Sequence, residues 1–562
     1  MLCKLIAFNG RYIHSCLALF YVRTALEQNL QGCQPEIVQY TINDPYYPTL
    51  RQIGSGDPAV LFFSVYIWNS IYIQRLINDL VKFLPKTPII MGGPQAQTLA
   101  RSLSPDLFQH CTVVKGEIEG VDSSFYRDIA RNKLQREYGC SRLSAFASPY
   151  RYEDFAGPLK NRNIYYESSR GCPFGCTYCL SAAERVVRHL PTAKVYEEIR
   201  NILRHGPKVI RFVDRTFNDL PKRALDIWRF LVDQAGETLF HFEMAPDRFT
   251  EDMFRFLEQI APGRFQFEIG VQSTNPQTLE AINRKCDLEK LAPNIRRLVS
   301  LDTIHIHLDL ILGLPHEDRE SYSRSFCEVF KLGPHYIQMG LLKILPDTPI
   351  SRCIEEYGLI VCQAPPYEVL ANRWVDRHEL ENLFWFGECV EAFYNNRFFR
   401  SFWDYLRKTD DDIFSFFEML LDVCRQKGFF NLAHTQELLS SILMDLIQNR
   451  PDRELLAELL IFDWLRCGHH FLPEHLEQEP LAQNRKKLWQ QMEQKWEGVY
   501  DHKTRDEFFR QSVFYRFSGE LLQELGITVE SSPAYVCFQV KREKTVFRLN
   551  SFLPIPAVKI GS

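Results

Sequence analysis

The most informative stretch of the sequence is Arg170-Gly-Cys-Pro-Phe-Gly-Cys-Thr-Tyr-Cys179, around which we expect the rest of the chain to be organised. It places Cys172, Cys176 and Cys179 in the spacing Cys-x-x-x-Cys-x-x-Cys. A short loop with this spacing can wrap three thiolates around one corner of a four-iron, four-sulfur cube, a cluster that proteins usually hold with four cysteines. With only three thiolates, one iron keeps an open position for a substrate or cosubstrate. The loop therefore predicts an open iron–sulfur cluster.

Two other interpretations of the loop are a structural zinc site and a chance group of buried cysteines. Zinc sites of this kind use four ligands, often as two Cys-x-x-Cys pairs, and no second pair lies within the usual spacing. Most of the 16 cysteines, such as Cys3, Cys33 and Cys111, are scattered singly and do not form a disulfide framework. Together with a candidate cluster, they indicate a reducing environment, so we expect a cytoplasmic protein.

Length and composition narrow the class of protein. A chain of 562 residues is too long for one ordinary domain, and 45% hydrophobic with 24% charged residues is typical of globular proteins. The net charge of −4 argues against a protein dominated by nucleic-acid electrostatics. The apolar N-terminus lacks a positive region and a cleavage site, so we expect a strand there and not a signal peptide. No run of 18 apolar residues occurs, so no membrane span is predicted.

The first domain is expected over residues 1–145. Strands are predicted at residues 2–8, 36–40, 59–63, 88–91 and 112–114, with helices at 17–28 and 71–83. Alternation of strands and helices predicts a parallel, doubly wound sheet of the Rossmann-like class. In such sheets a ligand binds outside the carboxyl ends of the strands.

Polar residues and glycines gather at these strand ends. The candidates are Asn9, Tyr12, His14, Ser15, Ser64, Tyr66, Trp68, Asn69, Gly92, Gly93, Pro94, Gly116 and Glu117. They suit a large ligand with amide or phosphate groups, although each turn alone could be an ordinary strand–helix connection. No Gly-x-Gly-x-x-Gly follows the first strand, so the dinucleotide fingerprint is missing.

A linker is expected over residues 146–162, followed by a second domain at 163–350. Its predicted strands are residues 163–168, 209–213, 239–244, 265–270, 304–312 and 336–342. Six strand–helix units in succession predict a (β/α)6 partial TIM barrel. Its active site would lie at the carboxyl ends of the strands.

Residues 351–562 are expected to form a mostly α-helical domain, because the strand–helix alternation stops there. The predicted helices are residues 376–393, 413–427, 435–448 and 453–467, and residues 533–540 with 544–550 suggest a terminal β-hairpin. Aromatic residues are frequent in this region. Most are expected to pack a core, and a minority could stack on a substrate or on nucleic acid.

The cysteine loop, with an aromatic residue before the third cysteine and a predicted strand before the loop, resembles the radical S-adenosylmethionine (SAM) superfamily. The resemblance implies that Cys172, Cys176 and Cys179 hold a 4Fe–4S cluster whose open iron binds the amino and carboxylate groups of SAM. Reductive cleavage then yields a 5′-deoxyadenosyl radical that abstracts hydrogen. It also implies an external electron donor of the flavodoxin or ferredoxin type.

The same resemblance implies the SAM contacts. These are Tyr178, Asp214, Arg215, Glu243, Glu268, Gln272, Asp309 and Gly313. Asp214 and Arg215 follow the second strand, where the family contacts the amino group, although they could instead form a solvated ion pair. Glu268 lies on an otherwise apolar strand, where an unpaired carboxylate would be costly, so a functional partner is expected.

The first domain resembles the cobalamin-binding domains that precede many radical SAM enzymes. The motif Asp-x-His-x-x-Gly, which supplies an axial histidine in other cobalamin proteins, is absent, so no axial ligand is expected from it. His14 is expected to form hydrogen bonds or cap a helix, with a smaller chance of being an axial ligand. The usual Gly-Glu-Gly-Glu turn is Gly116-Glu-Ile-Glu119 here, a departure that affects the approach of this turn to the corrin.

The C-terminal region resembles a domain of unknown function, DUF4080, through residues 365–370, Arg373-Trp374 and the run Asp463-Trp-Leu-Arg466. With the two front domains, the resemblance covers nearly the whole chain. It implies a cobalamin-dependent radical SAM methyltransferase that acts on an unactivated carbon of a small molecule. The alternatives are a non-methylating enzyme of the same kind, an enzyme that modifies a tRNA base, and a cobalamin or iron–sulfur sensor. The sequence does not identify a catalytic residue.

Overall fold

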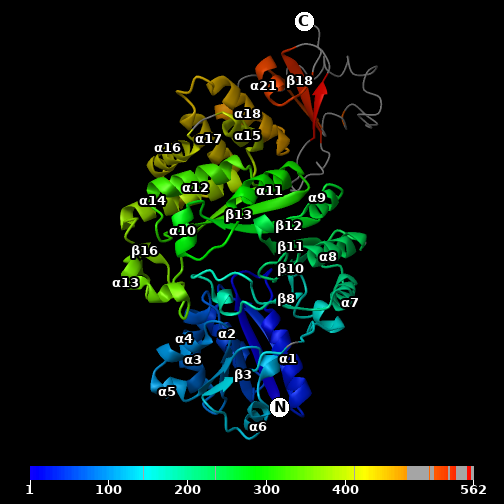
Figure 1. Ribbon diagram of the computed structural model, residues 1–562, viewed down its shortest axis with the longest axis vertical. Coiled ribbons are helices and arrows are strands. Elements are labelled where there is room, and N and C mark those ends of the chain that lie inside the picture. Colours follow the sequence, from blue (N-terminus) through cyan, green and yellow to red (C-terminus); the bar gives the residue numbers. More distant parts are fainter. Residues whose placement is uncertain are drawn as a thin grey trace.

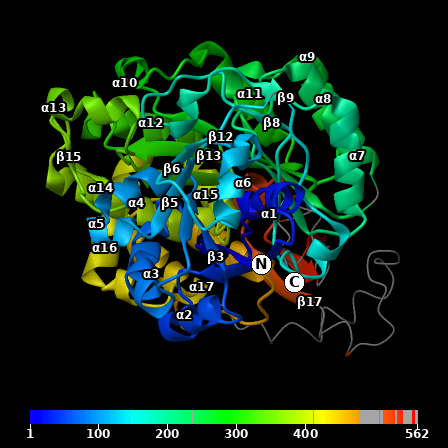
Figure 2. The same ribbon diagram turned by 90° about the horizontal axis from the view of Figure 1, so that it is seen from below.

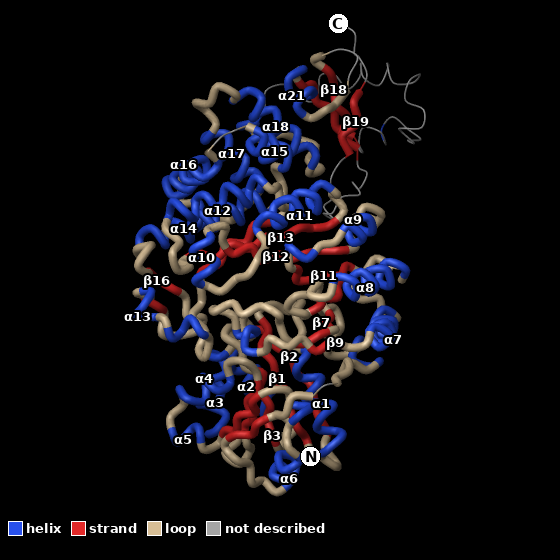
Figure 3. Tube along the Cα trace, in the orientation of Figure 1, coloured by secondary structure: helices blue, strands red, loops and turns tan. Residues whose placement is uncertain are grey.

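The computed structural model describes residues 1–143, 145–234, 236–409, 412–476, 506, 512–528, 532–539 and 553–557. Two groups of strands lie one above the other, and a layer of helices covers the upper group (Figures 1 and 3). The chain passes through them in order, from the first sheet near the N-terminus to the helices of the C-terminal region. The α/β class and the helical C-terminal region were both predicted, and both are confirmed.

The first sheet has six parallel strands in the order β2-β1-β3-β4-β5-β6. They are β1 (Leu2–Asn9), β2 (Gln34–Thr41), β3 (Val60–Ser64), β4 (Ile89–Gly92), β5 (Cys111–Lys115) and β6 (Glu137–Gly139). The helices between them are α1 (Leu17–Asn29), α2 (Tyr46–Gly54), α3 (Ser70–Phe83), α4 (Ala96–Ser102), α5 (Pro105–Phe108) and α6 (Ser123–Ala130). The sequence did not predict β6, because three residues are too few to show a period.

Alternation along the buried strand β1 separates the two faces of this sheet. Leu5 and Ala7 pack in a cluster that includes residues of α1 and α6. Ile6 and Phe8 pack in a second cluster with residues of α3 and α4. Seen from below, α1 and α6 lie on one side of the strands and α2, α3 and α5 on the other (Figure 2). A strand that is buried on both faces has no polar stripe, which is why it shows as a continuous apolar run.

The second sheet is also parallel, in the order β14-β13-β12-β11-β10-β7. Its strands are β7 (Ile164–Tyr166), β10 (Val209–Phe212), β11 (Leu239–Met244), β12 (Phe265–Gln272), β13 (Ile304–Leu312) and β14 (Tyr336–Leu341). Its helices are α7 (Thr192–Leu203), α8 (Pro221–Asp233), α9 (Glu251–Leu257), α10 (Pro276–Ala281), α11 (Leu288–Ser300) and α12 (Arg319–Lys331). This is the six-stranded partial barrel that the sequence predicted. A short antiparallel pair, β8 (Ser169–Arg170) with β9 (Arg188–His189), flanks the cysteine loop.

The C-terminal region is mostly helical. After α13 (Ile354–Tyr357) and the small pair β15 (Ile360–Val361) and β16 (Val369–Ala371), its helices are α14 (Arg377–Cys389), α15 (Arg400–Lys408), α16 (Ile413–Gln426), α17 (Gln436–Leu446), α18 (Arg453–Arg466) and α21 (Gly519–Glu524). A π-helical turn, Val390–Asn395, continues α14. None of the helices in the described part of the chain is long and apolar enough to cross a membrane.

An antiparallel sheet lies near the C-terminus, in the order β17 (Ser512–Phe517), β18 (Ala534–Gln539), β19 (Leu553–Ala557). Strand β18 coincides with the first predicted hairpin strand, but it pairs with β17 and β19. The second predicted strand, residues 544–550, lies outside the described residues.

The barrel and the C-terminal helices share one hydrophobic core. Phe326 of α12 contacts Phe386 of α14 at a ring-centroid distance of 4.9 Å and Phe417 of α16 at 5.6 Å. Trp403 of α15 stacks on Phe417 at 5.0 Å. All four rings are buried, so most of the aromatic residues predicted as core have that role. The C-terminal helices therefore cover the strand β14 side of the barrel and contribute to its stability.

The predicted linker is anchored to the first sheet by a buried ion pair. Asp154 lies in a 3-10 turn, Tyr152–Phe155, and accepts hydrogen bonds from both terminal nitrogens of Arg23 on α1. The two side chains are only 8% and 2% exposed. Breaking a buried pair leaves an uncompensated charge, which is far more costly than losing a surface pair.

Arg23→Gln should lower the midpoint of the first urea unfolding transition by the equivalent of about 3–5 kcal/mol, because Asp154 would remain buried without its counterion. The matched control is Glu27→Gln on the same helix, which breaks the more exposed pair of Glu27 with Arg151 and should cost about 1 kcal/mol or less. Equal losses in the two variants would contradict this role of the Arg23–Asp154 pair.

Candidate active site

The carboxyl ends of the two parallel sheets face each other across a cavity of 990 Å³. One wall comes from the turns that follow β1, β3, β4 and β5. The opposite wall carries Tyr165, Arg211, His241, Glu243 and Glu268 from the barrel strands. A ligand in this larger cavity would touch both sheets at once.

Most of the predicted first-sheet residues line this larger cavity. They are Asn9, His14, Ser15, Ser64, Tyr66, Trp68, Gly92, Gly93, Pro94, Gly116 and Glu117. The structure does not bring Tyr12 and Asn69 into this group. Tyr12 is 57% exposed and lies under the guanidinium of Arg162. Asn69 is buried, where its amide donates to Phe8 O and Ser64 O and accepts from the Tyr66 amide, so it holds the turn and does not face the cavity.

Glycines leave room in the wall. A Cβ atom at Gly92 would meet no atom closer than Val114 O at 4.0 Å, and one at Gly10 would meet none within 4 Å. Gly93 has a φ of +102° and packs its backbone against Val65, where a Cβ would come within 2.7 Å of the carbonyl oxygen. Gly93 is thus required by the turn itself, whereas at Gly10 and Gly92 the wall lets a large, flat ligand approach the backbone closely.

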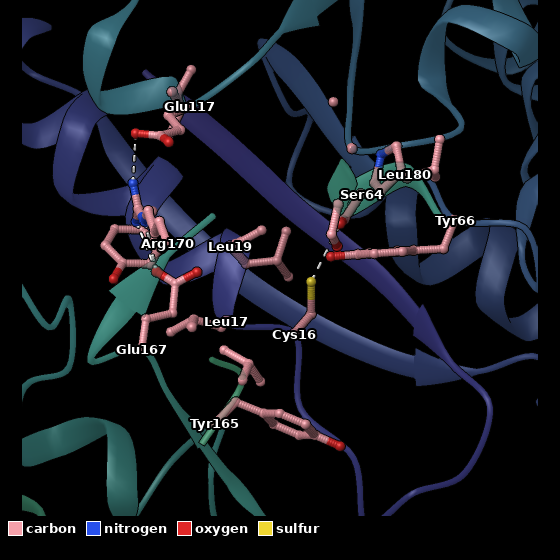
Figure 4. A pocket seen from close by; sticks show the side chains of 18 of the residues that line it. Cys16, Leu17, Leu19, Ser64, Tyr66, Glu117, Tyr165, Glu167, Arg170 and Leu180 are labelled. Carbon is pink, nitrogen blue, oxygen red and sulfur yellow. Dashed lines mark hydrogen bonds and ion pairs between the residues drawn. The ribbon is translucent and has the colours of Figure 1, made fainter. Parts of the chain in front are cut away.

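A group of neutral donors lies beside these glycines. Cys16 Sγ is 3.3 Å from Ser64 Oγ (Figure 4). The ring of Tyr66 stacks on that of Trp68 with centroids 4.3 Å apart. Burial raises the pKa of both Cys16 and Tyr66, so thiol and phenol keep their protons at neutral pH. The wall can then offer hydrogen bonds to a ligand without adding charge.

Arg170 connects the two sides of the larger cavity. Its guanidinium donates to Glu117 at 2.8 Å, Glu119 at 2.9 Å and Glu167 at 2.8 Å. Glu117 and Glu119 belong to the turn after β5, whereas Arg170 immediately precedes the cysteine loop. Arg188 also pairs with Glu117, which strengthens the same connection. In Figure 4, Arg170 and Glu117 lie together at the left, away from Cys16, Ser64 and Tyr66.

A smaller cavity of 200 Å³ contains the three motif cysteines, Cys172, Cys176 and Cys179. Cys172 Sγ is 3.6 Å from Thr216 Oγ1, and Arg284 Nη1 donates to Cys176 Sγ at 3.8 Å. In the described part of the chain, no three His, Cys, Asp or Glu side chains are grouped around a position for a single metal ion. A cube-shaped cluster takes each thiolate on a different iron, so three separate thiols that line the same cavity fit it.

Six of the eight residues expected to contact SAM line the smaller cavity. They are Tyr178, Arg215, Glu243, Glu268, Gln272 and Asp309. Asp214 and Gly313 are not among them. Asp214 is buried and accepts hydrogen bonds from Ser168 N at 3.0 Å and from Ser168 Oγ and Ser169 Oγ at 2.6 Å. Its carboxylate holds the strand before the cysteine loop, while Gly313 packs beside Val369 and Leu380.

The two cavities share part of their walls. The shared residues are Ser181, Arg215, Glu243 and Glu268. The register of the barrel explains this, because Glu243 on β11 lies directly opposite Glu268 on β12. Molecules in the two cavities could therefore meet at these side chains.

The two shared carboxylates differ in protonation. Burial raises the pKa of Glu243 to about 7, although Arg215 lies 3.6 Å away. Burial also disfavours the charge of Glu268, but the hydrogen bond from His241 and the nearby charges of His307 and Arg211 hold its pKa at about 2. One carboxyl group can thus carry a proton near pH 7 while its neighbour stays ionised.

Sequence reasoning missed several cavity residues. Tyr165, Arg211 and His241 lie in the middle of apolar runs, and Arg284 follows the helix after β12. A polar residue inside a buried strand was the signal that could have identified Arg211 and His241, because such a group is costly without a partner.

Two family models match the chain. One, described as Radical SAM superfamily, matches residues 166–325, and the other, described as Protein of unknown function (DUF4080), matches residues 355–538. The chain therefore carries a radical SAM domain followed by a DUF4080 domain. These matches confirm the resemblances of the second domain to the radical SAM superfamily and of the C-terminal region to DUF4080.

Two curated relatives are methyltransferases by name. The 2-(S-pantetheinyl)-carbapenam-3-carboxylate methyltransferase of Streptantibioticus cattleyicolor is 25% identical over 64% of this chain and 60% of its own length. The cobalamin-dependent radical SAM methyltransferase TokK of Streptomyces tokunonensis is 23% identical over 57% of this chain and 53% of its own length. The matches thus span less than two thirds of either relative.

Two solved structures share the fold. The radical SAM methyltransferase TsrM of Kitasatospora setae, solved with cobalamin and a 4Fe–4S cluster bound, superposes with a TM-score of 0.50 over 68% of this chain and 81% of that one, at 17% identity. The cobalamin-dependent SAM radical enzyme OxsB gives a TM-score of 0.56 over 83% and 79%, at 15% identity. At such identities the likeness establishes the fold.

Glu243→Gln should make unfolding less dependent on pH. The pKa of Glu243 is about 7 in the folded chain and has an ordinary value of 4.5. The unfolded chain ionises first, so the wild type loses stability as pH rises from about 4.5 through 7, whereas glutamine does not titrate. Urea midpoints at pH 5 and pH 8, measured without SAM, should differ less in the variant. The exposed Glu289→Gln is the control, and an unchanged pH dependence in Glu243→Gln would refute the assignment.

Proposed function

We propose that the protein is a cobalamin-dependent radical SAM methyltransferase that acts on an unactivated carbon of a small molecule. The observation that supports this most directly is the shared wall of the two cavities. A reaction that removes hydrogen with one cofactor and adds a methyl group with another needs both to reach the same carbon. Residues such as Arg215, Glu243 and Glu268 border both cavities, which suits that requirement.

The smaller cavity fits a cluster with SAM. Cys172, Cys176 and Cys179 would hold the cluster, and the Arg284 guanidinium beside Cys176 would stabilise negative charge on the sulfur. Tyr178, Gln272 and Asp309 would contact SAM from the remaining wall. An external electron donor of the flavodoxin or ferredoxin type would reduce the cluster, and a reducing cytoplasm would preserve it.

The larger cavity fits a corrinoid. Gly10 and Gly92 let the ligand approach the backbone, and Cys16, Ser64 and Tyr66 supply neutral polar groups. His14 Nδ1 is 2.6 Å from the Tyr165 hydroxyl, which supports a hydrogen-bonding role for His14 over that of an axial ligand. When bound, the cluster supplies the electron that cleaves SAM, and the corrinoid supplies the methyl group.

The proposal assigns a task to each region. Residues 1–145 would bind the corrinoid, 146–162 link the two sheets, 163–350 bind the cluster and SAM, and 351–562 support the barrel. The curated relatives that are methyltransferases by name, at 23–25% identity, favour methylation over the other radical reactions. None of the described contacts favours a tRNA substrate or a sensor.

Cys176→Ala should abolish SAM cleavage after anaerobic reconstitution and chemical reduction, because the cluster would lose one of its three thiolates. The wild type should form 5′-deoxyadenosine on reduction, and S-adenosylhomocysteine as well when hydroxocobalamin is added. Cys353→Ala, which alters a cysteine outside both cavities, should behave as the wild type. Deoxyadenosine without S-adenosylhomocysteine, despite bound corrinoid, would favour a non-methylating enzyme.

Gly92→Leu should prevent corrinoid retention, because the new side chain would occupy open space in the larger cavity. Gly139→Leu is the matched control, since Gly139 ends another strand of the same sheet, has an equally open Cβ position and does not line the cavity. The corrinoid absorbance that remains after gel filtration gives the result. Equal retention by both variants would place the corrinoid elsewhere.

A further inference from the structure

A row of polar side chains crosses the barrel beneath the larger cavity. One residue from each strand contributes: Tyr165, Arg211, His241, Glu268, His307 and Tyr336. Barrel interiors are usually filled by branched apolar side chains. The first four members also line the larger cavity. A polar row at this depth is costly unless its members satisfy one another or bind a ligand.

His241 cannot form hydrogen bonds with both of its neighbours in the row, because its ring has too few protons and lone pairs on the nitrogen that faces them. His241 Nε2 lies 3.1 Å from Glu268 Oε2 and also 3.1 Å from Arg211 Nη2. Burial lowers the pKa of His241, so the ring is neutral and carries one N–H. Glu268 is ionised and can only accept, so the proton belongs on Nε2. His241 Nε2 then has no lone pair left for Arg211.

Arg211 therefore forms a long ion pair with Glu268 but lacks a hydrogen-bond acceptor in the described part of the chain. Its closest carboxylate oxygen, on Glu268, is 3.7 Å away, beyond hydrogen-bond distance, and its side chain is 30% exposed. A guanidinium presents five N–H groups in a planar fork and cannot lose its charge. Its free N–H groups border the larger cavity, where a ligand can supply the missing acceptor.

A second donor lies beside Arg211. Tyr165 is its register partner on β7, and the Tyr165 hydroxyl is 2.6 Å from His14 Nδ1. Burial lowers the pKa of His14 and raises that of Tyr165, so both side chains are neutral. If the phenol donates to Nδ1, the Nε2–H of His14 remains; if Nδ1–H donates, the phenol O–H remains. Either tautomer leaves one donor for a ligand.

We infer that the substrate carries a carboxylate group, which Arg211 binds at the floor of the larger cavity together with the donor left by His14 and Tyr165. This inference rests on the proposed function, in which the substrate lies beside the corrinoid. A single negative charge matches the site better than a phosphate, because the ionised Glu268 lies 3.7 Å from Arg211 and would repel a dianion more strongly than a monoanion. The planar fork of arginine also matches a carboxylate.

Ligand-observed NMR with fixed probes tests the inference without knowledge of the substrate. The probes are butyrate, the neutral butyramide and inorganic phosphate. Each is titrated into reconstituted protein that carries hydroxocobalamin and SAM and is kept oxidised, so that no turnover occurs. Butyrate should bind at least about tenfold more tightly than the other two, which is the range for a hydrogen bond to a charged group.

Butyrate titrations of substituted proteins show whether butyrate binds at Arg211. Arg211→Gln should weaken butyrate binding at least about tenfold, and Arg211→Lys, which keeps the charge but not the fork, should lose less. Arg255→Gln, at an exposed arginine paired with Asp252, should leave butyrate binding unchanged. Thermal midpoints of all variants verify that they fold.

Two outcomes would overturn the inference. One is butyrate binding that is absent, unselective or unchanged in Arg211→Gln. The other is loss of corrinoid from Arg211→Gln, which would make a corrin side chain the partner of Arg211. The butyrate titration is also performed without hydroxocobalamin. If the wild-type protein retains no corrinoid, the proposed function is refuted, and this second titration still shows whether Arg211 binds a carboxylate.

Discussion

The ion pairs of Arg170 with Glu117, Glu119 and Glu167 are the interaction on which the rest of the site depends. Side chains that are 10–21% exposed form them, so the charges are largely removed from water and each needs its partner. Arg170 immediately precedes the cysteine loop, and Glu117 and Glu119 follow the strand β5 of the other sheet. The pairs therefore hold the carboxyl ends of two parallel sheets face to face, and the larger cavity exists because of that arrangement.

Burial and neighbouring groups determine whether each carboxyl group of the shared wall is protonated near neutral pH. Glu243 and Glu268 are neighbours on adjacent strands, yet burial dominates at Glu243 and the His241 hydrogen bond dominates at Glu268. The same hydrogen bond occupies the only proton of His241 and leaves Arg211 without an acceptor. Three adjacent strands, β10, β11 and β12, thus carry a guanidinium that is short of a hydrogen-bond acceptor, a carboxyl group that titrates near neutrality and an ionised carboxylate.

Predictions from sequence succeeded where the signal was local. The cysteine spacing predicted three thiols on one loop, and glycines after buried strands predicted the open turns of the first sheet. Asp214, Asn69 and Gly313 also have the residue types of a site, but in the structure they lie outside the walls of both cavities, where they satisfy backbone groups or pack beside apolar side chains. The residues next to Asp214 in the sequence do not reveal whether its carboxylate is unpaired or, as the structure shows, already accepts three hydrogen bonds.

The sequence by itself determined the fold class, the three-thiol loop and the strand ends that carry polar residues and glycines, because periodicity and spacing within a few residues are enough to define each of them. The tertiary structure alone decided which strand-end side chains face a cavity, and it brought Arg211 and His241 into the site. Those outcomes depend on inward positions of strands that are about thirty residues apart and on the docking of one sheet against another. Local sequence carries no information about such pairings until the sheets have formed.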